Sequence, residues 1–257
     1  MKYPNIHLAT FIDRPNRFIS HCRLMDSKTV VTVHVKNTGR TSILQPGILV
    51  SLSQNDNPNR KTKYDLIAAK KYNQFWINID SQVPNKLVNE GLMENFIKLA
   101  KINRITKVKP ETTFLNSRID FSGKDDSNNK FLLEVKGVTL FNKKIGAFPD
   151  APTQRGLKHV KTLTLAAKSG YLAYLLFIVQ TTGISIITID REIFPELAEA
   201  IKVAMASGVI VLAYDCKVTP DSISLNHPIK FDLNQKFKSD GLPSSIGLKS
   251  DKTNKKN

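Results

Sequence analysis

Two charged residues interrupt an otherwise apolar segment, Phe131–Val138, and this interruption limits the possible folds more than any other feature. The segment reads as a largely buried strand, in which Glu134 and Lys136 share one face because side chains two apart on a strand point the same way. Charged groups in such a strand need a partner or a metal ion. Asp120 precedes Glu134 by a hairpin-sized gap and also lies between apolar neighbours. The pattern predicts adjacent strands that bring two carboxylates and an ammonium together.

These three groups indicate a site for a divalent cation. Mg²⁺ prefers hard oxygen ligands and keeps several waters, one of which supplies a nucleophile. A neighbouring ammonium orients that water or stabilises charge on a phosphate. The chemistry implied is phosphodiester hydrolysis, with Asp120 and Glu134 binding Mg²⁺ or Mn²⁺ and Lys136 acting as the catalytic lysine. The alternative interpretation is an exposed strand that carries a Glu–Lys salt bridge; the apolar flanks argue against it.

The charge balance points to a nucleic-acid partner. The chain has 38 Lys and Arg against 22 Asp and Glu, a net charge of +16. Such an excess attracts phosphate polymers without sequence preference and predicts binding that weakens with salt. Neutral sugars give no reason for this charge, which disfavours a carbohydrate-binding module. Part of the excess lies in the polar segment 233–257, for which we expect a disordered basic tail.

The sequence also predicts where the protein acts. The first residues lack the continuous apolar core of a secretory signal. The longest apolar run, 171–179, is too short to span a bilayer, so no membrane partner is expected. Only two cysteines are present, far apart in the chain and each in an apolar stretch, which argues against a disulfide framework. We therefore expect a cytoplasmic protein.

Residues 1–82 show short β-type runs separated by turns rich in Gly, Asn and Pro. Five such strands predict a small barrel of the OB type, which binds single strands or oligosaccharides through one face and its loops. Phe18 is expected in the core rather than stacked on a base. The predicted strands are 17–24, 29–35, 48–53, 64–70 and 75–79. The basic residues expected to contact phosphates here are Arg14, Arg17, Arg40, Arg60, Lys61 and Lys63.

Residues 83–232 change character, because strands alternate with helices. This alternation implies a mixed sheet covered on both faces, in the order of restriction-endonuclease-like nucleases. The fold class predicted is therefore a two-domain α+β and α/β protein. The expected elements are helices at 85–102, 157–168 and 194–207, and strands at 112–121, 131–138, 171–180 and 209–214.

Four motifs in order resemble the sugar fermentation stimulation protein A family, over a match from about Arg14 to Ile229. The motifs are His34–Arg40, Ser117–Phe121, Leu133–Lys136 and Phe148–His159. The resemblance implies an OB domain, a domain like PD-(D/E)xK nucleases, non-specific DNA binding and a role in regulating maltose metabolism. Applied to this chain, it places the metal-binding acids at Asp120 and Glu134 and the catalytic lysine at Lys136.

The resemblance also implies a further acid at the metal. Glu90 suits the first helix, whereas Glu111 leads into the strand whose partner bears the site; we favour Glu111 as a third catalytic and metal-binding residue. Arg118 is counted among the nucleic-acid contacts.

Arg155 and His159, four apart at a helix start, share one face. If that face looks into the cleft, Arg155 binds a phosphate and His159 protonates a leaving group or contacts phosphate. The structural alternative is a helix capped by Thr153, with Arg155 bonded to Asp150. Asp150, close before this helix, is either a second metal ligand or only the partner of Arg155.

Two functions remain open from the sequence. One is a DNA-binding protein with a metal-dependent phosphodiester-cleaving site. The other is a non-catalytic DNA-binding regulator of sugar metabolism that retains the nuclease fold. A homodimer is compatible with either, since nucleases that cut both strands often pair two active sites.

Overall fold

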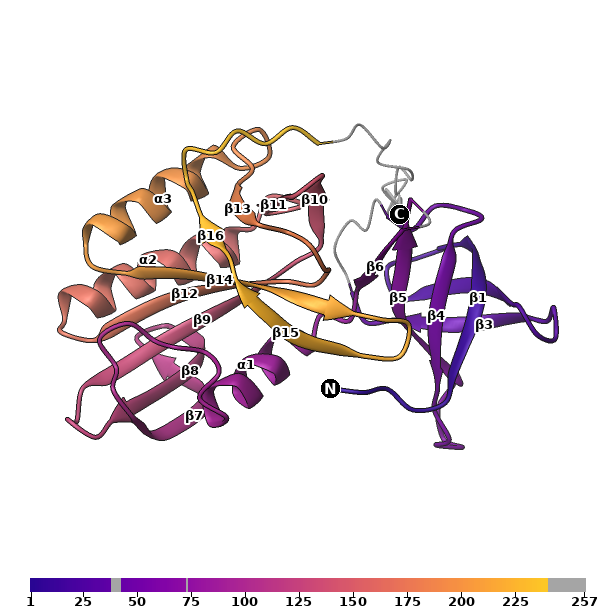
Figure 1. Ribbon diagram of the computed structural model, residues 1–257, viewed down its shortest axis with the longest axis horizontal. Coiled ribbons are helices and arrows are strands. Elements are labelled where there is room, and N and C mark those ends of the chain that lie inside the picture. Colours follow the sequence, from indigo (N-terminus) through magenta and orange to yellow (C-terminus); the bar gives the residue numbers. More distant parts are fainter. Residues whose placement is uncertain (38–42, 73, 240–257) are drawn as a thin grey trace, which may run out of the picture.

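A computed structural model describes residues 1–37, 43–72 and 74–239. The chain forms two parts that lie side by side, a β-barrel and a larger αβ part (Figure 1). Among the helices of the described residues, none is both long and apolar enough to cross a bilayer. Arg40 lies outside the described residues, as does the stretch 240–257 of the predicted tail.

The barrel closes through five strands. The sheet order β3-β2-β1-β4-β5-β6 has an additional parallel pairing of β3 with β5, which joins the two ends. Apolar side chains such as Phe11, Val33 and Leu66 alternate inward and are fully buried. β6 pairs with β5 at the edge of this sheet and stays outside the ring. The strands are β1 Ile6–Asp13, β2 Ile19–Leu24, β3 Val30–Val35, β4 Leu49–Gln54, β5 Tyr64–Lys71 and β6 Phe75–Asn78.

The predicted barrel had the right number of strands but one wrong member. β1 was missed, and the fifth predicted strand is β6. β1 fully buries only Ala9 and Phe11, so its alternation is weak in the sequence. Phe18 was also placed wrongly, because 45% of its surface is exposed just before β2.

The αβ part is built on a six-stranded mixed sheet with the order β15-β14-β12-β9-β8-β7. α1 packs on one face, while α2 and α3 cover the other (Figure 1). A small four-stranded sheet, β10-β11-β13-β16, completes this part. The helices are α1 Val83–Met93, α2 Gln154–Lys168 and α3 Pro195–Ala206. The large sheet comprises β7 Ile105–Phe114, β8 Ser117–Asp125, β9 Lys130–Val138, β12 Leu172–Val179, β14 Ile210–Val218 and β15 Ile223–Pro228, and the small sheet β10 Leu140–Asn142, β11 Ile145–Phe148, β13 Ile186–Ile189 and β16 Lys230–Phe231.

Two predicted elements differ from the structure. The first helix ends at Met93 rather than 102, and Asn95 just beyond it has a positive φ of 57° that a helix does not allow. The predicted strand 112–121 contains a hairpin turn, since β7 ends at Phe114 and β8 starts at Ser117. Leu115 in that turn has φ of 51°. The apolar Leu115 obscures this turn in the sequence, although Asn116 beside it is a typical turn residue.

The two parts are joined by buried polar contacts around Gln180, which is 2% exposed and follows β12. Its amide nitrogen donates to the Asn78 carbonyl oxygen and side-chain oxygen, at 3.1 Å each, and to the Asp80 carbonyl at 3.2 Å. Thr181 adds a bond from its hydroxyl to the Trp76 carbonyl at 2.9 Å. Because buried polar groups lose free energy when their partners are removed, these bonds fix the barrel against the large sheet.

Gly137 is required at this joint. A Cβ added there would lie 2.6 Å from Gln180 Oε1 and 2.8 Å from Pro84 Cγ. We expect Gly137→Ala to lower the free energy of unfolding by about 1–3 kcal/mol, the usual cost of overpacking. Urea unfolding measures this, with Gly146→Ala as the control, because a Cβ there meets nothing closer than 3.4 Å. Equal stability of the two variants would contradict the prediction.

Candidate metal centre

The two predicted acids meet where β8 and β9 separate. Regular pairing of these strands runs from Lys124 opposite Lys130 to Phe121 opposite Leu133 and then stops. Beyond that point the Asp120 carboxylate takes the place of a backbone acceptor, because its Oδ2 accepts the Val135 N–H at 2.8 Å. In the other direction the Asp120 N–H points to Glu134 Oε2 at 3.4 Å.

The strand β8 also rotates at this position. Ile119 packs with the α2 and α3 side of the sheet, whereas Phe121 packs with the α1 side. Residues two apart on a regular strand would share a face. The irregularity therefore turns Asp120 out of the ladder and toward Glu134 on the neighbouring strand.

Glu134 is bound from two sides. It is 1% exposed, and its Oε1 accepts from Lys136 Nζ at 2.6 Å. The Nδ1 of His159, on α2, donates to the same oxygen. Burial alone would raise the pKa of Glu134, but the His159 imidazole and the Lys136 ammonium outweigh burial and hold that pKa below its usual value. The glutamate is therefore kept ionised inside the protein.

Asp120 has the opposite balance. Burial raises its pKa, and the negative charge of Glu134 raises it further, against the Val135 N–H and the Asn85 side chain. Asn85 Nδ2, from the first turn of α1, donates to Asp120 Oδ1 at 2.9 Å. Two carboxylates that oppose each other's ionisation in a partly buried place are a favourable environment for a cation.

The donor set suits a hard divalent ion. Asp120 and Glu134 supply carboxylate oxygens, which Mg²⁺, Mn²⁺ and Ca²⁺ accept together with water. Among the described residues, no group of three or more His, Cys, Asp or Glu side chains is arranged to hold a metal ion. Asp120 and Glu134 would therefore hold such an ion with water completing its coordination.

The structure does not bring the other two acids into contact with this pair. Glu111 has φ of 53° and forms an ion pair with Arg118, and both side chains are 62% exposed. Glu90, on α1, lies 3.9 Å from the amino group of Met1. The residue of α1 that does reach Asp120 is Asn85. Sequence reasoning missed it: Pro84 marks the start of the helix, but nothing in the chain shows which strand that start approaches.

Thr153, Arg155 and His159, at the start of α2, have different surroundings. Thr153 caps the helix, with its hydroxyl oxygen accepting the Gly156 N–H at 2.9 Å. Arg155 is exposed and makes no hydrogen bond or ion pair with any described residue, Asp150 included. His159 is 4% exposed and points inward to Glu134.

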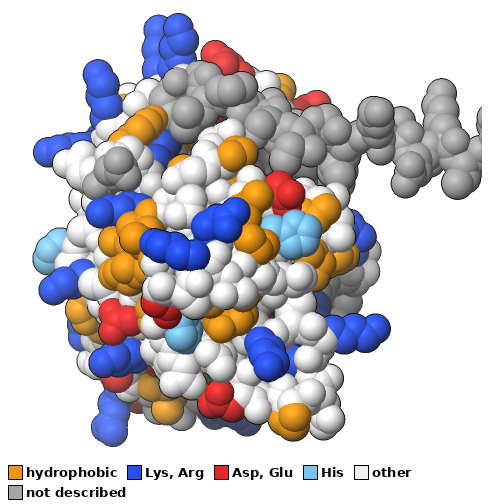
Figure 2. Space-filling model, turned by 90° about the vertical axis from the view of Figure 1, so that its right-hand side faces the viewer, with side chains coloured by type: hydrophobic (Ala, Val, Ile, Leu, Met, Phe, Trp, Pro, Cys, Tyr) orange, Lys and Arg blue, Asp and Glu red, His pale blue; other side chains and the backbone are white. Residues whose placement is uncertain are grey.

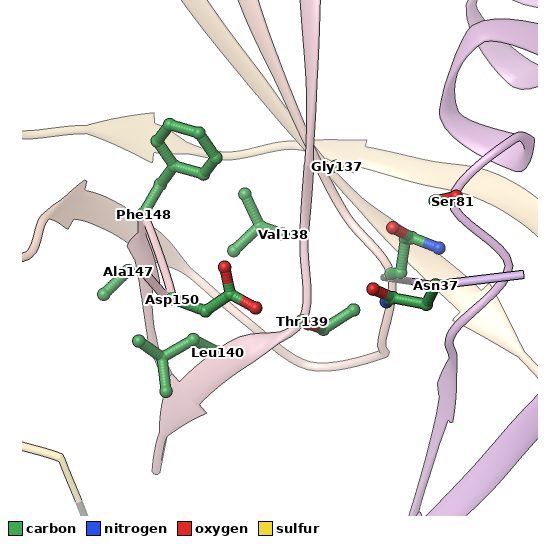
Figure 3. Close-up of a pocket in the computed structure, with 10 residues that line it drawn as sticks. Asn37, Ser81, Gly137, Val138, Thr139, Leu140, Ala147, Phe148 and Asp150 are labelled. Atoms are coloured by element: carbon green, nitrogen blue, oxygen red, sulfur yellow. The ribbon is translucent and has the colours of Figure 1, made fainter. Parts of the chain in front are cut away.

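Asp150 lies instead at a cavity of about 160 Å³ between the two parts. The cavity lies just beyond Lys136 along β9, next to Val138, and Figure 3 shows Asp150 and Asn37 on opposite sides of it. Its lining comes from both parts, because Asn37 and Ser81 belong to the N-terminal half of the chain. This position separates Asp150 from the contacts of the carboxylate pair.

Two of the basic residues predicted to bind phosphate form hydrogen bonds within the barrel. Arg14 donates to the carbonyl oxygens of Arg17, at 2.7 Å, and Asn37, at 2.5 Å. Arg60 binds Asp65 through both guanidinium nitrogens, at 3.0 and 2.6 Å. Arg17 remains exposed and lies over the Phe18 ring, 4.8 Å from its centre. Of these three arginines, Arg17 is exposed, whereas Arg14 and Arg60 are partly buried.

Comparison with known proteins agrees with the two-part architecture. Residues 12–79 match the SfsA N-terminal OB domain, and residues 82–222 match the sugar fermentation stimulation protein RE domain. The predicted fold class, an OB barrel followed by a mixed αβ domain, is thereby confirmed.

Relatives match over nearly their full length. A sugar fermentation stimulation protein homolog from Enterococcus mundtii is 47% identical over 94% of this chain and 100% of its own. A homolog from Clostridium acetobutylicum is 48% identical over 91% of this chain and 100% of its own. A solved structure, Pyrococcus furiosus SfsA in complex with Ca²⁺, has a TM-score of 0.79 at 22% identity and covers 91% of this chain and 98% of that one. From the motifs, the barrel with its αβ partner and these matches, it follows that the chain belongs to the sugar fermentation stimulation protein A family.

Proposed function

We propose that this protein binds DNA and cleaves its phosphodiester bonds with a divalent ion held by Asp120 and Glu134. The observation that carries the proposal is the meeting of these two carboxylates at the split between β8 and β9, with Lys136 and His159 on one oxygen of Glu134. A net charge of +16 favours a polyanionic substrate. The Ca²⁺ complex of the archaeal relative supports the choice of a hard divalent ion.

The residues of the chain have distinct tasks. Mg²⁺ or Mn²⁺, when bound, would neutralise phosphate charge and make a coordinated water more acidic. Lys136, with 15% of its side chain exposed at the edge of the buried site, stabilises negative charge that develops on the phosphate. His159 holds Glu134 ionised and in position through its Nδ1–H. Asn85 holds the Asp120 carboxylate toward Glu134.

A non-catalytic DNA-binding regulator of sugar metabolism is the second candidate. It is favoured by one specific observation: Asn85, rather than an acid, is the residue of α1 that contacts Asp120. A site with two acids binds a divalent ion more weakly than one with three, so this protein would retain the fold and bind DNA without cutting it.

The test uses purified protein with labelled single-stranded, duplex and branched DNA and RNA, in Mg²⁺, Mn²⁺ or EDTA. Cutting in either metal but not in EDTA supports the nuclease. Binding that weakens steeply with salt, without cutting in any metal, supports the regulator. The absence of salt-dependent binding to every nucleic acid would contradict both candidates.

A further inference from the structure

The outer face of α2 carries a basic stripe. Arg155, Lys158, Lys161 and Lys168 are all exposed. At 3.6 residues per turn, Lys158, Lys161 and Lys168 fall within an arc of about 80° on one side of the helix, and Arg155 lies about 60° further round, on the exposed first turn. None of the 15 residues of α2 is acidic. We call these four residues the α2 track.

The other helices do not share this feature. α3 carries Glu196 and Glu199 beside Lys202, and α1 carries Glu90 beside Lys86. A run of unmixed positive charge on a helix is unfavourable, because like charges three or four residues apart repel each other. The α2 track therefore destabilises the protein when no anion is bound, and a bound anion would relieve this repulsion.

Three of the four cations have no polar partner among the described residues. Arg155, Lys161 and Lys168 make no hydrogen bond or ion pair with any residue that the structure describes. Lys158 donates to the Asn116 carbonyl at 2.6 Å, and so holds the turn before β8.

The barrel provides the contrast, because Arg60 and Lys36 there bind Asp65. Figure 2 looks onto the barrel end, and the Lys and Arg side chains on its coloured surface are scattered among apolar and acidic ones.

The track lies on the helix that contacts the metal centre. The inward face of the same helix carries His159, bound to Glu134, and Thr162, whose hydroxyl lies 2.8 Å from that of Ser117 at the start of β8. From Arg155 to Lys168 the helix rises about 20 Å, at 1.5 Å per residue. Leu165, which is 51% exposed, is an apolar residue between Lys161 and Lys168 on the same side of the helix.

We infer that the α2 track binds the sugar–phosphate backbone on one side of the phosphate that lies at Asp120 and Glu134. The inference rests on the proposed binding of nucleic acid. It adds that the surface that binds the backbone is on the helix that bears His159, rather than on the barrel. With phosphates about 3.4 Å apart along the axis of each strand, 20 Å corresponds to about six base pairs. The track thus sets the direction and the minimum length of the substrate.

The test compares two triple variants that remove the same charge. One is Arg155→Gln, Lys161→Gln and Lys168→Gln; the other, on the barrel, is Lys28→Gln, Lys61→Gln and Lys63→Gln, all exposed. Binding to a fluorescent duplex is measured in EDTA over a range of salt. Each phosphate contact contributes about 0.9 to the slope of log K against log salt, so the α2 variant should lose about 2.7 from the slope.

The outcomes are separable. A parent protein that binds nucleic acid, with a slope lowered in the α2 variant and not in the barrel variant, supports the track. An equal loss of slope in the two variants contradicts the preference for the helix over the barrel. An unchanged slope in the α2 variant of a binding parent overturns the track and leaves the proposed function standing. No binding by the parent removes the proposed function itself.

A length series is a second measurement. Lys168→Gln should weaken binding to a long duplex and have no effect on one too short to reach from the carboxylate pair to Lys168. An equal effect at all lengths would contradict the predicted direction of the track.

Discussion

Glu134→Gln and Lys136→Met are each expected to reduce metal-dependent strand cleavage by on the order of 10²–10³-fold or more, the usual loss when one group that stabilises transition-state charge is removed. Glu134→Gln removes the negative charge that would bind the ion but keeps the shape of the side chain. Lys136→Met removes the ammonium next to the phosphate. The measurement is the single-turnover cleavage rate of the best substrate at saturating Mg²⁺ or Mn²⁺.

Matched controls separate chemistry from folding and charge. Glu90→Gln changes an acid on α1 that lies beside the amino terminus, and Lys202→Met changes an exposed lysine on α3. Both should cut at the parental rate. Thermal unfolding should show that the site variants remain folded. If both site variants are folded and cut as fast as the parent, Glu134 and Lys136 are not part of a catalytic centre, and contaminating nuclease becomes the explanation for any activity.

The second large effect is on stability: Asp65→Ala should lower the free energy of unfolding by about 3–5 kcal/mol. Asp65 is 5% exposed in β5 and is the common acceptor for Arg60, Lys36 at 3.1 Å and His34 at 3.1 Å. Removing one partner of a buried ion pair leaves the opposite charge without compensation, which costs about that much. Urea unfolding measures the change, with the exposed Asp126→Ala as the control. A loss below 1 kcal/mol would contradict the prediction.

The same carboxylate predicts a pH dependence. Burial would raise the pKa of Asp65, but Arg60, Lys36 and His34 together lower it from 3.8 to about 2. A lowered pKa in the folded protein adds stability above pH 3.8 that is lost as the pH falls toward 2. The amount is about 2 kcal/mol. The stability difference between the parent and Asp65→Ala should therefore shrink between pH 4 and pH 2; a constant difference would contradict this assignment.

The local patterns of the sequence were sufficient for much of the fold. Apolar runs bounded by turns located β9, β12 and β14 to within a few residues, and the alternation of strands with helices gave the class of the second part. The charged pair Glu134 and Lys136 stood out because a buried strand rarely carries unpaired charge. These features depend on residues close together in the chain, so they can be read without a structure.

The sequence by itself thus determined the barrel followed by an αβ domain, and the strand that carries Glu134 and Lys136. Only the tertiary structure decided which side chains surround those residues. Asn85 reaches Asp120 across 35 positions, and His159 reaches Glu134 across 25. Glu111 turned to Arg118 instead, on a backbone with positive φ. The physical reason is that spacing fixes which side chains share a face, whereas contacts between distant segments depend on how elements pack and where a strand ladder breaks.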